Sequence, residues 1–263
     1  MDLKIKGKNV LVSAGSKGIG RAAVELFIQE GCNVAFCSSN EENVRKAEHE
    51  IKTKYNIEAI GLVCDINKLI DIERTVKTIK DKLGSIDILV NNCGGPVPGF
   101  FESLIEENWS SAFDQVLMSA IRFTRLVLPV MKSKKWGRII NVTSISVKQP
   151  VDNLILSNAF RSAVTAFSKT LSNQVGKDNI TINNVAPGYT LTSRIDQLSV
   201  VRAKAAGTTP EKILESMADD VPMKRLASAE EVASLIVYLA SEQAAYITGT
   251  TIGVDGGAIK ATY

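Results

Sequence analysis

Short apolar runs alternate along the chain with longer segments whose apolar residues recur at helical spacing. A continuous apolar run is typical of a strand buried on both faces, and a period of three to four residues is typical of an amphipathic helix. The strand-like runs are 10–12, 33–37, 58–63, 86–90, 138–142, 180–185 and 250–254, and the helical segments are 41–55, 67–83, 103–131, 154–176, 210–218 and 229–240, with a further helix after Gly20. The alternation predicts a single α/β domain over 1–263, a doubly wound parallel sheet of about seven strands with helices on both faces.

A glycine-rich loop joins the first strand to the first helix. Gly15, Gly18 and Gly20 fall between the apolar run 10–12 and the helix that follows. Glycines let a phosphate approach the backbone, and a helix N-terminus offers unpaired N–H groups and a partial positive charge. The strand–loop–helix context predicts a nucleotide site, and the alternative is a loop that only turns the chain.

The composition narrows the class of protein. The chain has 263 residues, of which 45% are hydrophobic, and a net charge of +3, which is too small to indicate nucleic acid as a partner. We find no signal-peptide pattern and no apolar run of transmembrane length, so we expect a cytoplasmic protein with no membrane partner. Cys32, Cys37, Cys64 and Cys93 form no C-x-x-C pair, which favours buried thiols in a reducing compartment. The only histidine, His49, lies in a charged helical segment, and we expect no metal site.

The segment 188–222 is the least regular part of the chain. It follows the sixth strand, at the edge where a parallel sheet binds ligands, so we expect it to act as a lid over the substrate. A plain connecting loop is the alternative. Apolar residues in this segment and in the stretch 95–101 indicate a partly apolar pocket; those of the segment are Leu191, Ile195, Leu198 and Val200.

Five motifs occur in order at the ends of the predicted strands. They are S-A-G-S-K-G-I-G (13–20), Asp65, N-N-C-G (91–94), P-G-Y-T-L-T (187–192) and V-D-G-G (254–257). Along essentially its whole length the sequence resembles the short-chain dehydrogenase/reductase family, and in particular its 3-oxoacyl-ACP-reductase-like members. The resemblance implies a Rossmann fold that binds a nicotinamide cofactor. The cofactor contacts it implies are Ser13, Gly15, Ser16, Lys17, Gly18, Ile19, Gly20, Ser38, Ser39, Asp65, Ile66, Asn91, Gly94, Arg161, Pro187, Gly188 and Thr192.

The residues after the second strand bear on the choice of cofactor. A carboxylate there would bind the ribose 2′-hydroxyl of NAD and repel a 2′-phosphate. The sequence has Ser38 and Ser39 instead, and no carboxylate before Glu41. Lys17 could face a 2′-phosphate, so NADP(H) is favoured over NAD(H); the alternative is that Lys17 is a solvated charge.

The catalytic positions depart from the family pattern. The family has a Ser after the fifth strand, a Tyr thirteen residues later and a Lys four residues beyond that. Counting from Ser144 puts Ser157 and Arg161 at the Tyr and Lys positions, in an S-N-x-x-R helix, and Val116 stands where the preceding helix often has Asn. A serine hydroxyl is much less acidic than a phenol and the side chain is shorter, whereas arginine keeps its positive charge.

Other residues could supply the proton. The candidates are Lys148, Tyr189, or a water held by Ser144 and Ser157; the alternatives are that Lys148 is a loop charge and that Tyr189 only packs. We therefore expect an oxidoreductase that transfers a hydride between a nicotinamide cofactor and a small carbonyl or alcohol substrate, with an atypical proton donor. A catalytically impaired nucleotide-binding protein on the same scaffold is the alternative.

Two predicted helices are apolar on more than one face. The segments 103–131 and 154–176 carry Phe113, Leu117, Ile121, Val164 and Phe167 beyond a single stripe. Such helices are buried both against their own sheet and against a partner, and the family resemblance implies the same pairing. We expect a homodimer or a homotetramer.

Overall fold

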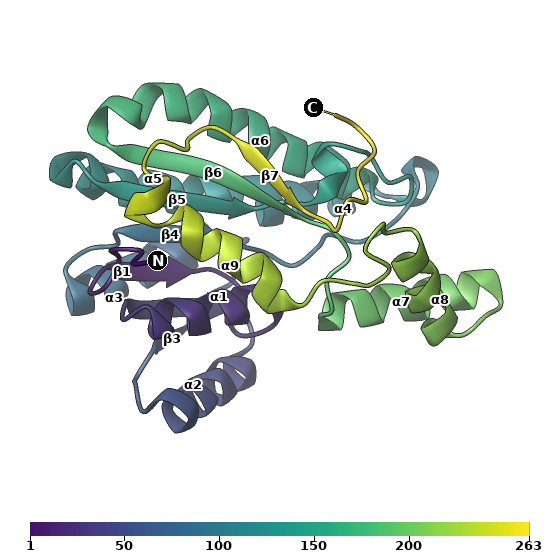
Figure 1. The fold of residues 1–263 in the computed structure, drawn as a ribbon, viewed down its shortest axis with the longest axis horizontal. Helices are drawn as coiled ribbons and strands as arrows, with labels where there is room; N and C mark the ends of the chain where they lie inside the picture. Colours follow the sequence, from purple (N-terminus) through teal and green to yellow (C-terminus); the bar gives the residue numbers. More distant parts are fainter. Residues whose placement is uncertain (263) are drawn as a thin grey trace.

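A seven-stranded sheet forms the centre of the structure, a computed structural model that describes residues 1–262 (Figure 1). All adjacent strands run parallel, in the order β3-β2-β1-β4-β5-β6-β7. The direction of winding reverses between β1 and β4, where sheets of this kind bind ligands at the carboxyl ends of the strands. The predicted single α/β fold is confirmed. The strands are β1 (Asn9–Val12), β2 (Asn33–Ser38), β3 (Ile60–Val63), β4 (Ile88–Asn91), β5 (Gly137–Val142), β6 (Ile180–Pro187) and β7 (Thr251–Val254).

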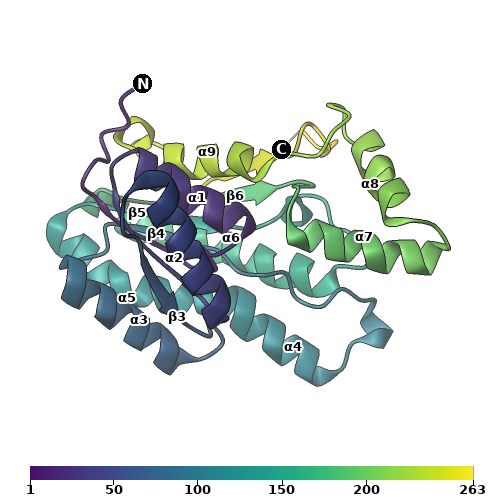
Figure 2. The same ribbon diagram turned by 90° about the horizontal axis from the view of Figure 1, so that it is seen from below.

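Helices cover both faces of the sheet (Figure 2). One face packs against α1 (Gly18–Gln29), α2 (Glu41–Tyr55) and α9 (Ala229–Leu239), and the other against α3 (Leu69–Leu83), α5 (Ser119–Lys134) and α6 (Ile155–Val175). Successive side chains of a strand point to opposite faces, so Val10 and Val12 belong to the first core and Leu11 to the second. Because both faces are covered, most strand residues are apolar, and polar residues inside β5 and β6, such as Asn141 and Asn184, are buried as well. None of the helices in residues 1–262 has the combined length and apolar character that a membrane span requires.

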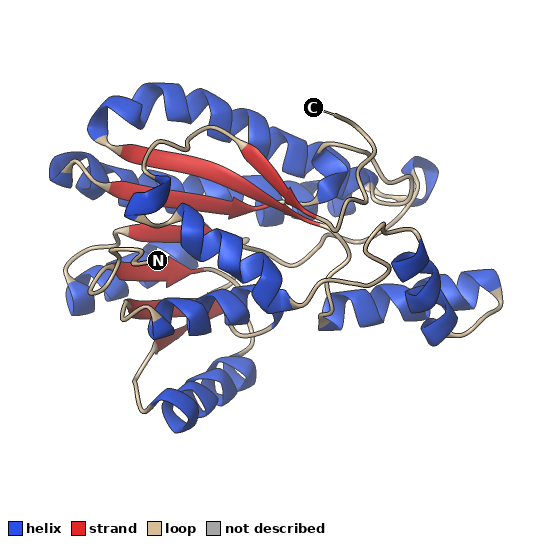
Figure 3. Cartoon of the chain, viewed as in Figure 1, coloured by secondary structure: helices blue, strands red, loops and turns tan. Residues whose placement is uncertain are grey.

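Two helices stand beyond the carboxyl ends of the strands, toward which the arrows in Figure 3 point. They are α7 (Ser193–Ala206) and α8 (Pro210–Asp219), and they pack on each other through a small apolar cluster. The sequence predicted a helix at 210–218 but an irregular segment where α7 forms, and the second prediction was wrong. The buried stripe of α7 is Ile195, Ser199 and Ala203. Only Ile195 is a large apolar residue, so the sequence shows a weak helical pattern of apolar residues in this segment.

The prediction of one continuous helix over 103–131 was also wrong. The chain forms α4 (Glu106–Ala112), a π-helical segment η2 (Phe113–Met118) and then α5. A π segment bonds five residues apart instead of four, a change that an apolar pattern does not reveal. Val116 in this segment is buried, whereas Phe113 is 41% exposed.

Candidate active site

A cavity of about 390 Å³ opens at the carboxyl ends of the strands, bordered by α7. This volume lies in the range of small-molecule sites. The loops after β1, β4, β5 and β6 and the start of α6 all contribute to its wall. Many of the residues singled out from the sequence line it together, namely Ser16, Lys17, Gly18, Ile19, Ser38, Gly94, Ser144, Ser157, Arg161, Pro187, Gly188, Tyr189 and Thr192.

The loop after β1 brings the backbone close to this cavity. Gly18 has a φ of +54°, which favours glycine, and a Cβ at Gly20 would lie 2.4 Å from the carbonyl oxygen of Ala14. No side chain caps the N-terminus of α1, so its first N–H groups are left for a ligand. The loop therefore fits a phosphate-bearing group. Ala14 itself has a φ of +47°, a conformation that costs an L-residue roughly 1–2 kcal/mol.

Three predicted residues of this loop shape it without lining the cavity. The hydroxyl of Ser13 donates to the carbonyl oxygen of Asn92 at 2.6 Å and accepts from its N–H at 2.9 Å, which ties the loops after β1 and β4 together. A Cβ at Gly15 would lie 2.6 Å from the Cβ of Phe36. Gly15 and Gly20 thus serve close packing of the backbone.

One end of the cavity lies beside the end of β2. Ser38, Asn43 and Lys17 line it there, whereas Ser39 is exposed and lies outside the lining. Glu41, the nearest carboxylate in sequence, forms an ion pair with Arg45 on the exposed surface of α2. No carboxylate lines this end within the described residues. Asn43 was not singled out from the sequence.

Three other predicted contacts lie outside the cavity wall. Asp65 accepts a hydrogen bond from the N–H of Asn67 at 3.1 Å and pairs with Lys68 at 3.5 Å, and Ile66 is its half-buried neighbour. Asn91 is buried and donates to Oδ1 of Asn141 at 2.8 Å, which links β4 to β5. Its contact therefore supports the sheet beneath the cavity.

Ser144, Ser157 and Arg161 meet at the end of β5. Ser157 and Arg161 are both 7% exposed and lie one turn apart on α6, where Nε of Arg161 donates to Oγ of Ser157 at 3.2 Å. Nη1 of the same arginine donates to the carbonyl oxygens of Val142 at 2.8 Å and Thr143 at 3.0 Å. Oγ of Ser144 accepts from the N–H of Ser146 at 3.1 Å. Each serine Oγ thus accepts a hydrogen bond and keeps its own O–H proton for another partner.

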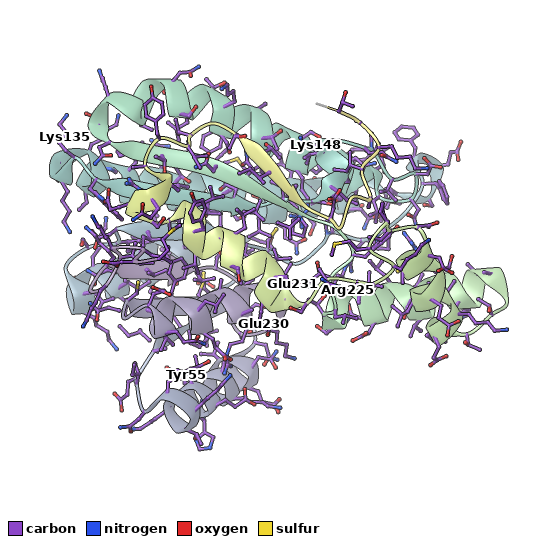
Figure 4. All side chains as sticks on the ribbon, in the orientation of Figure 1. Tyr55, Lys135, Lys148, Arg225, Glu230 and Glu231 are labelled. Atoms are coloured by element: carbon purple, nitrogen blue, oxygen red, sulfur yellow. The ribbon has the colours of Figure 1, made fainter. Side chains whose placement is uncertain are left out.

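The two further candidates for a proton donor differ in position. Lys148 lies near the N-terminal end of α6, apart from α7 and α8, and is not part of the cavity wall (Figure 4). Tyr189 does line the cavity, and its ring also packs against the apolar cluster of α7 and α8. Of these two candidates, only Tyr189 lines the cavity that Ser144 and Ser157 line.

Two arginines of α7 were missed from the sequence. Nη2 of Arg194 donates to the carbonyl oxygen of Pro96 at 2.8 Å, which joins α7 to the loop after β4. Burial lowers the pKa of Arg194, and the nearby charge of Arg161 lowers it further. Arg202 lines the cavity farther along the helix. The only signal for them is their spacing of eight residues, which is informative only once α7 is known to be a helix.

The apolar part of the wall was predicted in part. Ile195, Leu198 and Val97 line the cavity, as the sequence suggested. Leu191 and Val200 are both 56% exposed and lie outside it, because they occupy the outer side of the segment.

Comparison with known proteins identifies the family. The family model described as enoyl-(acyl carrier protein) reductase matches residues 13–258. The chain belongs to the short-chain dehydrogenase/reductase family. Curated relatives of this reductase include the uncharacterized oxidoreductase YvrD of Bacillus subtilis, 33% identical over 99% of both chains, and the 3-oxoacyl-[acyl-carrier-protein] reductase FabG of Vibrio harveyi, 32% identical over 97% of this chain and 98% of that one.

Solved structures of other family members superpose closely on this reductase. L-sorbose reductase from Gluconobacter frateurii, complexed with NADPH and L-sorbose, is 32% identical with a TM-score of 0.94, and the match covers 99% of this chain and 100% of that one. YwfH, an NADPH-dependent reductase involved in bacilysin biosynthesis, is 31% identical with a TM-score of 0.92, over 97% and 100% of the two chains. The short-chain dehydrogenase/reductase fold is therefore present over nearly the whole length of the chain.

Proposed function

We propose that this protein reduces a small carbonyl substrate to an alcohol and uses NADPH in preference to NADH. The observation that carries the proposal is one continuous cavity that joins the glycine-rich loop after β1 to two hydroxyl groups, those of Ser144 and Ser157. The cofactor preference is supported by Lys17, Ser38 and Asn43, which stand without a carboxylate at the far end of that cavity. The NADPH complexes of two related structures agree with it.

The substrate oxygen would lie between the hydroxyl groups of Ser144 and Ser157. NADPH, when bound, supplies the hydride that reaches the carbonyl carbon. Nε of Arg161 donates to Oγ of Ser157, so the O–H proton of Ser157 is free to donate to the substrate oxygen. The positive charge of Arg161 favours negative charge on that oxygen, which is where charge develops during reduction.

We propose that Ser157 passes its proton to the substrate oxygen and regains one from solvent water. In this proposal Ser157 and Arg161 stand where the family has its Tyr and Lys. A water held between Ser144 and Ser157 would deliver the proton in the same way. Tyr189 is the alternative proton donor, because it also lines the cavity. The segment 188–222 covers the substrate, because α7 borders the cavity and Arg194 is bonded across to Pro96.

We also propose that the protein forms a homodimer or a homotetramer through α4, η2, α5 and α6. Phe113 is 41% exposed on this surface, and the edge-to-face pairs Phe101–Trp109, Trp109–Phe160 and Phe113–Phe160 connect the aromatic rings there. Exposed apolar patches of this kind are typical of interfaces. Val164, which the sequence also assigned to the surface pattern, is 3% exposed and packs inside the subunit.

The experiment follows NADPH consumption with small ketones and β-keto esters. Ser157→Ala should lower kcat/KM by about 10²–10³-fold, which is typical for the loss of a donor to the reacting oxygen. Ser162→Ala removes a hydroxyl elsewhere on α6, outside the cavity wall, and should leave kcat/KM unchanged. The double variant Ser157→Tyr with Arg161→Lys should reduce generic ketones faster, since a positioned proton donor contributes about 10²–10⁴-fold. Equal rates for the wild type, Ser157→Ala and the double variant would refute the proposed role of Ser157.

A further inference from the structure

All charged side chains in the cavity wall are positive. Lys17, Arg161, Arg194 and Arg202 line it, and no aspartate or glutamate does within the described residues. None of these four cations belongs to an ion pair formed in residues 1–262. A cavity lined by charges of one sign attracts ions of the opposite sign, so four cations without a carboxylate partner favour an anionic ligand.

The four cations occupy different parts of the cavity. Lys17 lies at the end with Ser38 and Asn43, by the phosphate-binding loop. Arg161 directs Nη1 at two carbonyl oxygens at the end of β5 and Nε at Ser157. Lys17 is therefore assigned to the proposed cofactor end of the cavity, and Arg161 to the end of β5 and to Ser157.

The two arginines of α7 remain. They are eight residues apart, which is about 12 Å along a helix and places them on one side of it. Leu198, midway between them, also lines the cavity. Helix α7 begins near the sheet and ends away from it (Figure 1), so Arg202 lies farther from the strand ends than Arg194 does. Arg194 is bonded to Pro96, whereas Arg202 is partly exposed and makes no side-chain hydrogen bond or ion pair in the described part of the chain.

We propose that the substrate carries a carboxylate that Arg202 binds, with its carbonyl group at Ser144 and Ser157 and its carbon chain along Leu198. This rests on the proposed reductase function and names its substrate class, an oxo acid. Val97, Val151 and Leu154 also line the cavity and provide an apolar wall for such a chain. A guanidinium binds a carboxylate through two parallel hydrogen bonds, so this contact also fixes the orientation of the substrate.

The experiment compares each oxo acid with its own methyl ester. The probes are 3-oxobutanoate, 4-oxopentanoate and 5-oxohexanoate with their methyl esters, and the variants are Arg202→Gln, Arg202→Lys and the control Lys204→Gln. Lys204 is an exposed cation on the same helix outside the cavity wall. The wild type should prefer at least one acid over its ester, and Arg202→Gln should lower kcat/KM for that acid by about 10- to 100-fold through KM, as expected for a lost charge-assisted contact. The ester and KM for NADPH should not change, Arg202→Lys should restore part of the effect, and Lys204→Gln should show none.

Two results would overturn the assignment. A raised KM for NADPH in Arg202→Gln, with an unchanged ratio of acid to ester, would assign Arg202 to a cofactor phosphate. No acid preferred over its ester in the wild type would remove the carboxylate site. A second readout separates this inference from the reductase proposal: the change in fluorescence of bound NADPH when each acid is added. Acids that bind the wild type but not Arg202→Gln, without any turnover, would keep the anion site and refute the reductase proposal.

Discussion

Replacement of Arg161 by methionine should destabilise the protein measurably, because this arginine holds the end of β5. Its side chain donates three hydrogen bonds of 2.8–3.2 Å, two of them to the carbonyl oxygens of Val142 and Thr143. A hydrogen bond to a charged group contributes about 1.5–3 kcal/mol. The two carbonyl contacts together should therefore contribute about 3–6 kcal/mol. Methionine fills most of the volume and removes a buried charge, which reduces the net loss to about 2–4 kcal/mol.

The assay is urea unfolding and thermal unfolding of Arg161→Met and Ser157→Ala at one protein concentration, since assembly shifts apparent stability. At about 2–4 °C per kcal/mol for a domain of this size, Arg161→Met should lower Tm by about 5–15 °C. Ser157→Ala removes only one of the three contacts, the one to Nε, and should lose less stability than Arg161→Met does. Arg161→Met with wild-type stability but a raised KM for NADPH would refute the reasoning, because the arginine would then serve the cofactor ribose instead of β5.

Three further predictions concern other parts of the molecule. Lys17→Ala should weaken binding of NADPH but not of NADH, by the factor expected for about 1.5–3 kcal/mol, in a fluorescence titration; equal loss for both cofactors would contradict it. Light scattering at micromolar concentration should give a dimeric or tetrameric mass, and Phe113→Asp should reduce it; a monomeric wild type would refute the proposed interface. Burial opposes ionisation of Asp87, but hydrogen bonds from Lys134, the Asn9 N–H and Ser85 outweigh it and lower its pKa below the unfolded value of about 4. Its contribution to stability is therefore present above about pH 4 and lost as the pH falls through the folded pKa, so Asp87→Asn should flatten the acid limb of the stability curve; an unchanged limb would count against it.

The fold was largely readable from the sequence because both faces of the sheet are covered. Leu11 packs on one layer of helices and Val10 on the other, so a central strand such as β1 shows an uninterrupted apolar run. The exceptions have physical causes. Helix α7 buries Ser199 and Ala203, which do not mark an apolar stripe, and the π-helical turn at 113–118 leaves no trace in the spacing of apolar residues.

The sequence predicted those site residues that belong to loop motifs directly after a strand. Ser16, Gly18 and Gly94 were found from their loops and line the cavity, whereas Ser13 and Gly15 belong to the same loop but shape it from outside the wall. The sequence could not indicate Arg194 or Arg202, because their approach to the cavity depends on where α7 lies in space. No local pattern carries that information.

The most direct test of the proposed hydride transfer is to follow deuterium from NADPH labelled at C4 of the nicotinamide. The protein would be incubated with NADPH labelled on either face of that carbon, together with the β-keto esters and the oxo acids, and the products analysed by mass spectrometry. We expect an alcohol that carries deuterium at the former carbonyl carbon for one of the two labels, formed at a rate that Ser157→Ala reduces by about 10²–10³-fold. Stoichiometric binding of NADPH with no deuterium in any product would contradict it and leave a nucleotide-binding protein on a reductase scaffold.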